Sequence, residues 1–562
     1  MQNADDHSDP VAVGGERMLM RGRGLDLGQY ATRFPFEQRS LLHVLAAQAQ
    51  TRPGATWLVF DGRDSLTYKQ AFELVNCFGN ALAERLPSGG QVALFLRNQL
   101  EFMPAFLGAM AGGGVTVPLN ADSRGPLLEY VIRKSEAKII VARADLLDRL
   151  SALASLGEVE LVVVCGQAEG LPKQIHGAET ITWEQLLAGQ PAIASRPLPD
   201  SWETSLVQFT SGTTGNSKGV VYSHHFLYLY SALLADAQER SSEDVLTTPL
   251  PLFHVAALHQ VAACSLHAGC SGHLKSRFSA SRFWQEAAED GATWSIFLGP
   301  MAEIILKTVK QAPPHRLQEI FCVPFPPNGV EFESRFGVKF QWQGYGMTEV
   351  YPLPMKRKML EGVERDTIGS PPPWMEFGVV DEHDRVLAPG EVGELVFRPR
   401  IPYAMTSGYF KAPEATVEAF RGMMFHTGDL GAYDEQLLLH YRGRREDRIR
   451  RRGENISAVE LEYVAMRHEH VVEAAAYGVP GEFGEHEVKL DVVLGGELDL
   501  DDLHRWLVEQ LPRYMVPRYL ECLQELPKTP SQKIQKYKLA EASLERESVR
   551  VYEQAGRKQQ GR

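Results

Sequence analysis

Residues Val207 to Val221 read Val-Gln-Phe-Thr-Ser-Gly-Thr-Thr-Gly-Asn-Ser-Lys-Gly-Val-Val. Hydroxyl residues and glycines at 210–215 stand between two apolar runs, so the pattern predicts a strand, a loop and a second strand. Glycines let backbone N–H groups approach an anion, hydroxyls donate further hydrogen bonds, and Lys218 adds a mobile positive charge. The loop is therefore predicted to hold phosphate.

The spacing of this loop differs from that of the nucleotide P-loop, which has Gly, four residues and then Gly-Lys-Ser/Thr at the start of a helix. Here Gly212 and Gly215 precede Lys218. A surface turn rich in Ser, Thr and Gly is the alternative interpretation. Against it, the stretch resembles, nearly residue for residue, the signature loop of the adenylate-forming superfamily, which comprises acyl-CoA synthetases, peptide-synthetase adenylation domains and luciferases. Ser217 stands where that loop usually has proline.

Length and composition indicate a soluble protein with more than one domain. The chain has 562 residues, 44% of them hydrophobic and 23% charged, which suits a large multi-layer domain followed by a smaller one. A net charge of −13 argues against nucleic acid as the main partner.

The six cysteines are scattered without a Cys-x-x-Cys pair, a pattern that favours a reduced, cytoplasmic setting. The first ten residues are polar and acidic, and the most apolar run, 103–119, is broken by Gly and Pro. No export signal and no transmembrane segment are therefore expected.

Strands and helices alternate after residue 40. Helices are predicted over 40–49, 69–86 and 101–110, and strands over 56–60, 91–96, 115–119, 138–142 and 161–165. A further helix is predicted from Ile304 onward. This spacing is typical of sheets covered by helices on both faces. Residues 1–35 lack a steady period, and we expect them to form a weakly ordered extension.

Later segments match other motifs of the same superfamily, in its order. Gln343-Gly-Tyr-Gly-Met-Thr-Glu349 offers glycines, an aromatic face, a hydroxyl and a hard oxygen ligand. The resemblance implies that Tyr345 stacks on adenine and that Glu349 binds Mg²⁺. In the segment Phe425 to Leu430, it implies that Asp429 accepts both ribose hydroxyls.

Further motifs mark a hinge and a second domain. The basic run 441–452 resembles the superfamily hinge, with Arg444 contacting ribose and phosphate and Glu446 at a pivot where Asp or Lys is usual. Gly453-Glu-Asn-Ile-Ser457 is common in the carnitine/crotonobetaine-CoA ligase-like branch, and Gly453, Glu454 and Asn455 are implied to lie along the CoA path. Leu526 to Lys538 resembles the terminal lysine loop and selects Lys533, with Gln532 in place of the usual glycine.

The acyl pocket is the least specified part of the site. His254 lies in a turn where relatives place an aromatic residue or histidine that gates the pocket. Val323 and Phe325 replace the small residues of a Gly-Ala-Pro type turn. Gly344 is implied to border both the nucleotide and the acyl group. Carnitine-like, medium-chain, aryl and polycyclic carboxylates all stay open.

The resemblance implies an α/β N-terminal domain, with two doubly wound sheets and a small β-barrel subdomain, and a smaller mobile α+β C-terminal domain. The chain is expected to divide into an extension at 1–35, the N-terminal domain at 36–442, a hinge at 443–447, a lid domain at 448–540 and a tail at 541–562. The implied nucleotide site comprises Thr210, Ser211, Gly212, Thr213, Thr214, Gly215, Lys218, Gly344, Tyr345, Gly346, Thr348, Asp429 and Arg444. The implied catalytic residues are Thr210, Lys218, Glu349 and Lys533.

The implied activity is an ATP-dependent ligase. A carboxylate and Mg·ATP give an acyl-adenylate and pyrophosphate, and CoA then gives acyl-CoA and AMP. The substrates are ATP, CoA and a small carboxylic acid, with Mg²⁺ as cofactor, and homodimeric assembly stays open. Transfer to a carrier-protein thiol or an amine is an alternative acceptor reaction, and a non-catalytic acyl or nucleotide sensor is an alternative of another class.

Overall fold

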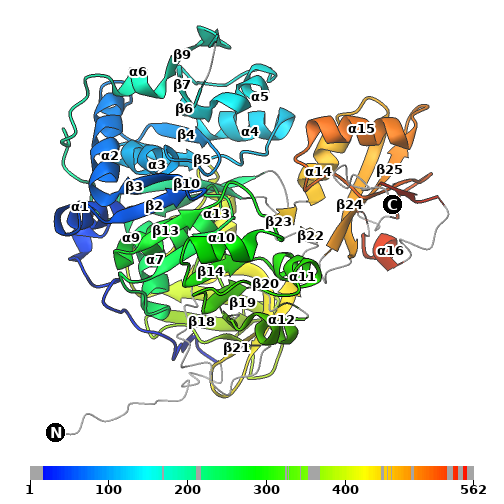
Figure 1. Cartoon of the computed structure of the whole chain (residues 1–562). Helices are drawn as coiled ribbons and strands as arrows, with labels where there is room; N and C mark the ends of the chain where they lie inside the picture. Colours follow the sequence, from blue (N-terminus) through cyan, green and yellow to red (C-terminus); the bar gives the residue numbers. More distant parts are fainter. Residues whose placement is uncertain are drawn as a thin grey trace.

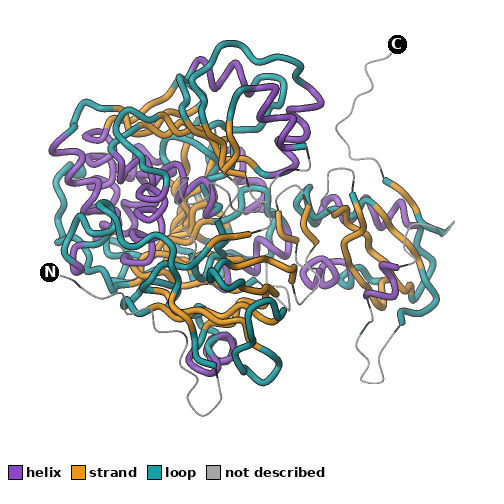
Figure 2. Tube along the Cα trace, turned by 90° about the horizontal axis from the view of Figure 1, so that it is seen from below, coloured by secondary structure: helices purple, strands orange, loops and turns teal. Residues whose placement is uncertain are grey.

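The chain forms a large N-terminal domain and a smaller C-terminal domain, the latter at the right of Figure 1. The structure is a computed structural model, and it describes residues 17–167, 170–210, 217–322, 326, 328–341, 344–351, 367–444, 449–451, 454–456, 458–481, 486–527, 534, 536–541 and 548–552. Strands and helices are mixed through both domains (Figure 2). The predicted α/β domain followed by a small α+β domain is confirmed.

The first sheet has eight strands and is parallel except at its two ends. The helices α2 (Tyr68–Ala83) and α3 (Phe102–Ala111) cover one face, and α4 (Gly125–Ser135) covers the other. Burial on both faces explains why its central strands are continuously apolar. In order, the strands are β11 (Lys218–Ser223), β10 (Thr204–Thr210), β5 (Val115–Pro118), β4 (Gln91–Phe95), β6 (Ala137–Arg143), β7 (Leu161–Cys165), β9 (Ala178–Thr182) and β8 (Gln174–Ile175).

The second sheet has seven strands and is parallel except for its last pair. Its helices include α1 (Leu41–Thr51), α7 (His224–Ala237) and α9 (Cys264–Ala268), which join α2 and α3 in one central core between the two sheets. The strands run β16 (Lys339–Gln341), β15 (Glu319–Cys322), β14 (Trp294–Phe297), β12 (Val245–Thr248), β13 (Ser271–Leu274), β2 (Thr56–Phe60) and β3 (Asp64–Thr67).

A third sheet corresponds to the subdomain predicted as barrel-like. It has six strands, all paired antiparallel: β1 (Met20–Arg21), β18 (Met375–Val380), β19 (Gly393–Pro399), β20 (Phe425–Tyr433), β21 (Leu439–Arg444) and β17 (Thr367–Gly369). The predicted ribose aspartate, Asp429, lies in the middle of β20.

The prediction of a weakly ordered extension is wrong for residues 17–35. Met20 is buried in β1, and Asp236 of α7 accepts hydrogen bonds from the backbone N–H groups of Tyr30 and Ala31, both at 3.0 Å. These partners lie about 200 residues away in sequence, so no local pattern reveals them. Residues 1–16 lie outside the described part of the chain.

The helix predicted from Ile304 onward begins earlier. The observed helix, α11, spans Gly299–Thr308, with Pro300 in its first turn. Proline fits there because its missing N–H has no partner within a helix at that position and its fixed φ suits helical backbone.

The C-terminal domain starts with a hairpin of β22 (Ile449–Arg451) and β23 (Glu454–Ile456). A four-stranded sheet follows: β24 (Val471–Pro480), β25 (His486–Leu494), β26 (Tyr519–Cys522) and β27 (Arg550–Val551). Its helices are α14 (Ala458–Ala465), α15 (Leu500–Gln510) and α16 (Lys536–Glu541). The hinge predicted at 443–447 falls mostly outside the described residues, and the domain boundaries stay predictions.

None of the described helices combines the length and the apolar character that crossing a membrane requires. All six cysteines are free thiols.

Candidate functional site between the two domains

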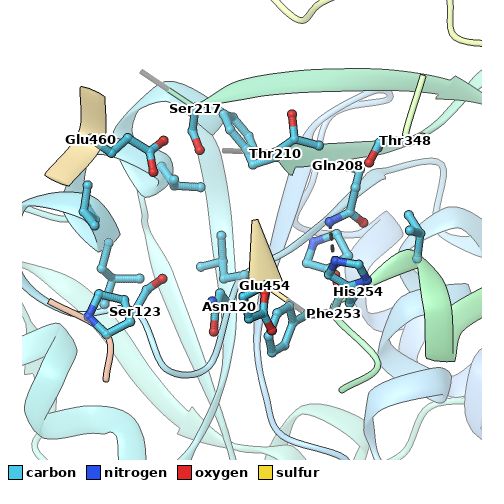
Figure 3. A pocket seen from close by; sticks show the side chains of 18 of the residues that line it. Asn120, Ser123, Gln208, Thr210, Ser217, Phe253, His254, Thr348, Glu454 and Glu460 are labelled. Carbon is cyan, nitrogen blue, oxygen red and sulfur yellow. Dashed lines mark hydrogen bonds between the residues drawn. The ribbon is translucent and has the colours of Figure 1, made fainter. Parts of the chain in front are cut away.

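A cavity of about 260 Å³ lies between the N-terminal and C-terminal domains. It opens beyond the carboxyl ends of β10 and β5, which is where open α/β sheets place their ligands. Figure 3 shows side chains of the cavity wall, several of them predicted site residues. The lining includes Asn120, Gln208, Thr210, Ser217, His254, Gly346, Thr348 and Glu349 from the N-terminal domain and Glu454, Glu460 and Tyr514 from the C-terminal domain.

The hairpin of β10 and β11 brings two predicted phosphate ligands to one end of the sheet. Thr210 is the last residue of β10 and pairs with Lys218, the first residue of β11. The ammonium group of Lys218 lies 5.0 Å from the centre of the Tyr409 ring, close enough for a cation–π interaction. The intervening Ser211, Gly212, Thr213, Thr214 and Gly215 lie outside the described residues.

Tyr409 also connects this hairpin to Glu349. Its hydroxyl donates a hydrogen bond of 3.0 Å to Oε1 of Glu349, and the backbone oxygen of Glu349 accepts from the N–H of Thr406 at 2.9 Å. Tyr409 was not predicted from the sequence: its one local signal is an aromatic residue after a glycine in Ser407-Gly-Tyr-Phe410, and this does not reveal its contacts with Lys218 and Glu349. Lys218, Tyr409 and Glu349 thus form one chain of contacts, which ends at Glu349 in the cavity wall.

The wall around Glu349 is suited to Mg²⁺. Glu349 is a buried carboxylate, and the hydroxyl residues Thr210 and Thr348 line the same cavity. In the described part of the chain, no group of three or more His, Cys, Asp or Glu side chains could hold a metal. A single carboxylate nevertheless fits Mg²⁺, because this ion keeps several waters and is commonly bound through one or two carboxylates together with substrate phosphates.

Asp429 and Tyr345 contact each other and are not among the residues that line the described cavity. The hydroxyl of Tyr345 donates a hydrogen bond of 2.6 Å to Oδ2 of Asp429, and both residues are buried. The N–H of Asp429 donates to the hydroxyl of Thr427 at 3.0 Å, and Arg444 stands opposite Asp429 in the pairing of β20 with β21. Tyr345 and Asp429, two predicted nucleoside-binding residues, are therefore in direct contact, and the backbone of Arg444, a third, is next to Asp429.

Glu394 of β19 holds the part of β20 that carries Asp429. One of its oxygens accepts a hydrogen bond from the N–H of Gly428 at 2.9 Å, and the other contacts Nδ1 of His426 at 3.1 Å and a guanidinium nitrogen of Arg421 at 2.9 Å. Burial favours a raised pKa for Glu394, but the hydrogen bonds and the positive charges outweigh it and lower the pKa to about 2. This part of β20 is thus held in place by an ionised carboxylate.

His254 begins the short helix α8 (Val255–Ala257) and lines the cavity. Asn98, which follows β4, fixes the preceding turn: its amide donates to the backbone oxygen of Leu250 and accepts from the N–H of Leu252, both at 2.8 Å. Gln208 of β10 donates to the backbone oxygen of Phe253 at 3.0 Å. The first sheet therefore positions the turn that precedes His254. Val323 and Phe325 lie outside the described residues, and Gly344, which is described, precedes Tyr345 with a φ of 153°.

A stack of rings fills the space behind Gly346. Tyr351 lies on Tyr230, with ring centres 4.2 Å apart, and Tyr230 lies on His259, 4.0 Å away. Tyr222 continues the stack and donates a hydrogen bond to the backbone oxygen of Thr348. A Cβ atom on Gly346 would lie 2.4 Å from the Tyr351 ring, so this position has room for glycine alone. Burial lowers the pKa of His259 to about 3, so its ring is uncharged.

The C-terminal domain contributes Glu454 from β23, Glu460 from α14 and Tyr514. The amide of Asn120 donates to the Tyr514 hydroxyl at 3.1 Å across the domain boundary. Burial raises the pKa of the Glu454 carboxyl, and the charge of His254 opposes that shift. The backbone of Asn455 is in β23, opposite Arg450. The predicted residues Lys533, Glu446 and Gly453 lie outside the described part of the chain.

The fold and this site define an adenylate-forming architecture, and comparison with known proteins agrees. The model of the AMP-binding enzyme family matches residues 45–410, and the model of the AMP-binding enzyme C-terminal domain matches residues 460–533. The chain therefore belongs to the AMP-binding enzyme family.

Two similar proteins are CoA ligases. A crotonobetaine/carnitine–CoA ligase of Shigella flexneri is 30% identical over 461 residues, covering 79% of this chain and 87% of that protein. A sulfoacetate–CoA ligase of Cupriavidus necator is 29% identical over 512 residues, covering 89% of this chain and 97% of that protein.

Solved structures share the fold. A variant of o-succinylbenzoate CoA synthetase from Bacillus subtilis superposes with a TM-score of 0.76 at 23% identity, covering 89% of this chain and 98% of that one. An amide bond synthetase from Marinactinospora thermotolerans gives a TM-score of 0.74 at 24% identity, covering 89% of this chain and 99% of that one. The prediction of an adenylate-forming enzyme is confirmed.

Proposed function

We propose that the protein is an ATP-dependent carboxylic acid–CoA ligase that works in two steps. A carboxylate attacks the α-phosphorus of ATP, giving an acyl-adenylate and pyrophosphate, and the CoA thiol then attacks the acyl carbon and expels AMP. The observation that carries the proposal is the cavity whose wall joins Thr210, Thr348 and Glu349 of one domain to Glu454 of the other. The similarity of this chain to CoA ligases supports CoA as the acceptor.

In the first step, charge grows on the oxygens of the departing pyrophosphate. We assign Thr210, Lys218 and the glycine and hydroxyl residues at 211–215 to those oxygens, because donors aimed at developing charge stabilise the transition state more than the ground state. Mg²⁺ at Glu349 would supply further positive charge to the phosphates.

The nucleoside is assigned to the neighbouring wall. Asp429 accepts from the ribose hydroxyls, Tyr345 lies beside the adenine with Gly344 and Gly346 giving it room, Thr348 donates to phosphate, and Arg444 contacts ribose and phosphate. The hydrogen bond from Tyr345 to Asp429 supports this assignment, because it keeps one carboxylate oxygen in a fixed direction.

The second domain supplies the remaining groups in turn. We assign Lys533 to the substrate carboxylate and the α-phosphate during adenylation, since lysine delivers a point charge on a long stem. Rotation at Glu446 then exchanges Lys533 for the segment Gly453 to Asn455, along which CoA enters. His254 and Val323, with Gly344, are assigned to the acyl group.

The setting is proposed to be the cytoplasm, where free thiols such as these persist.

A pyrophosphate-release screen tests the proposal. Purified protein, ATP and Mg²⁺ are incubated with a panel of acids that includes crotonobetaine, carnitine, sulfoacetate, o-succinylbenzoate, anthranilate and fatty acids of several lengths, with and without CoA. Acid-dependent pyrophosphate release and a CoA thioester detected by mass spectrometry are expected. Pyrophosphate release without thioester, but with product on adding an amine or a carrier protein, would contradict CoA as the acceptor, and no release with any acid would contradict the ligase.

A further inference from the structure

Ser217 and Glu460 join the two domains at the edge of the cavity. Ser217 directly precedes Lys218 in the N-terminal domain, whereas Glu460 lies in the first turn of α14 in the C-terminal domain. The side chain and the backbone N–H of Ser217 both act on the Glu460 carboxyl group, and the two residues line the same cavity. Figure 3 shows this carboxyl group pointing toward Ser217.

The contact depends on a residue that departs from the family's usual loop, which has proline at this position. Proline has no backbone N–H and no hydroxyl, so it could offer Glu460 neither of the two donors. Serine supplies both. The departure at Ser217 therefore creates an interdomain contact that the usual loop could not make.

The surroundings make this contact part of a wider domain boundary. Glu460 is 7% exposed, and a buried carboxyl group needs hydrogen-bond partners to offset its lost hydration. The hydroxyl of Tyr130 in α4 donates to the backbone oxygen of Ser217 at 3.3 Å. Nearby, Asn120 donates to Tyr514, and Leu127 packs on the core of the C-terminal domain.

The contact is specific to one orientation of the domains. Glu462, two residues after Glu460 and so on another side of α14, pairs with Lys536 of α16, with 2.6 Å between Nζ and Oε1. Figure 1 shows α16 farther from the N-terminal domain than α14 and β23. Lys536 is three residues from Lys533, so bringing that segment to the cavity turns Glu460 away from Ser217.

We propose that Ser217 and Glu460 are positioning residues for thioester formation: Ser217 donates hydrogen bonds to the Glu460 carboxyl group, and this contact holds the domain orientation in which Glu454 faces the cavity. This inference rests on the proposed two-step function. The burial that raises the pKa of Glu460 agrees with a closely packed contact. Since both residues act through the domain orientation, their loss should affect the second step and spare the first.

The test has two readouts. The first is the distribution of interdomain distances by single-molecule fluorescence transfer, with dyes on the exposed Cys522 and on a cysteine introduced at the exposed Glu184, in a Cys77→Ser background. This measurement uses the protein without any substrate. The second compares acid-dependent ATP–pyrophosphate exchange with single-turnover thioester formation from supplied acyl-adenylate, using the acid that releases most pyrophosphate in the screen.

Ser217→Pro and Glu460→Ala are expected to move the distance distribution away from that of the wild type and to slow thioester formation about tenfold, as hydrogen bonds to an ionisable group warrant. ATP–pyrophosphate exchange should persist. Ser217→Ala retains the N–H and should give a smaller change, and Glu469→Gln, at an exposed carboxylate of the same domain, should match the wild type.

Unchanged distance distributions in both Ser217→Pro and Glu460→Ala would overturn the proposal, as would equal slowing of the two half-reactions. If no acid supports pyrophosphate release, the proposed function fails, and the distance distribution still decides whether this contact sets the domain orientation.

Discussion

Asp429 shows how far one carboxylate depends on its immediate neighbours. It accepts a hydrogen bond from Tyr345, its own N–H donates to Thr427, and Glu394 accepts from the N–H of Gly428 directly before it. The sequence identified Asp429 and Tyr345 through a motif, but their mutual hydrogen bond and the part of Glu394 emerge only in three dimensions, because the residues involved come from separate segments of the chain.

Asp429→Asn should raise the KM for ATP about 10-fold to 100-fold, because an amide accepts hydrogen bonds more weakly than a carboxylate and loses about 1.5–3 kcal/mol per charged contact. Steady-state kinetics with varied ATP measures this change. Glu435→Gln, at an exposed position close by, serves as the control. An unchanged KM for ATP in Asp429→Asn would remove Asp429 from the ribose site.

Lys533→Ala should abolish adenylate formation and spare thioester formation from supplied acyl-adenylate. A transition-state charge of this kind contributes roughly 3–4 kcal/mol, which corresponds to a loss of about 100-fold to 1,000-fold. The measurement follows both half-reactions separately, with Lys536→Ala as a neighbouring control for loss of charge. Equal loss of the two half-reactions in Lys533→Ala would count against the assignment.

At the level of secondary structure, the pairing of β19 with β20 is held by Glu394. Glu394→Gln should lower the free energy of unfolding by about 2 kcal/mol, since it removes an ionised acceptor from His426, Gly428 and Arg421. Because the folded pKa is lowered to about 2 from an ordinary value of 4.5, the wild-type advantage should be complete above pH 4.5 and vanish as the pH falls toward 2. Urea titrations at several pH values measure the difference in free energy of unfolding between the wild type and Glu394→Gln. A difference that does not change with pH would contradict this account.

The sheet of the C-terminal domain contains a buried ionic cluster on β25 and its neighbours. Nζ of Lys489 lies 2.8 Å from Asp491, 2.6 Å from Glu521 and 3.0 Å from the Tyr477 hydroxyl, and Lys489 is fully buried. Lys489→Met should destabilise the protein by about 3–5 kcal/mol, because two buried carboxyl groups lose their cation. Lys69→Met, at an exposed pair, should change the free energy of unfolding by less than about 0.5 kcal/mol. Equal effects of the two substitutions would contradict the role of the cluster.

Secondary structure was predictable where the local pattern is strong. The strands at 56–60 and 161–165 agree with β2 and β7 to the residue, because apolar runs bounded by turns determine them. The packing of residues 17–35 was not predictable, since it depends on Asp236 and on β18, both distant in sequence. The role of Tyr409 was not predicted for the same reason. Tyr409 contacts Lys218 and Glu349, and spacing along the chain does not reveal these contacts.

For the whole molecule, the orientation of the domains should depend on pH. Burial, opposed by the hydrogen bonds from Ser217, raises the pKa of Glu460 from 4.5 to about 7. The contribution of this group to the observed orientation is therefore complete below pH 4.5 and is lost as the pH rises through 7, where the buried carboxyl group ionises.

The interdomain distance distribution should accordingly move away from the observed orientation between pH 6 and pH 8. Glu460→Gln cannot ionise, so its distribution should not respond to pH in this range. Tyr130 and Glu454, which lie nearby, have raised pKa values set chiefly by burial. If the interdomain distance distribution of Glu460→Gln responds to pH as strongly as that of the wild type, the effect belongs to another group, such as Glu454.

The ring stack behind Gly346 bears on how the substrate range of this enzyme can be altered by laboratory evolution. The rings of Tyr351, Tyr230 and His259 are stacked one on the next in that order. Replacing one ring by a smaller side chain therefore removes support from the next ring and leaves a gap that the neighbouring side chains enter. Single substitutions there should be poor starting points for admitting a bulkier acid. Libraries that vary two adjacent rings together are the more productive design, because they change the space behind Gly346 while keeping the rings in contact.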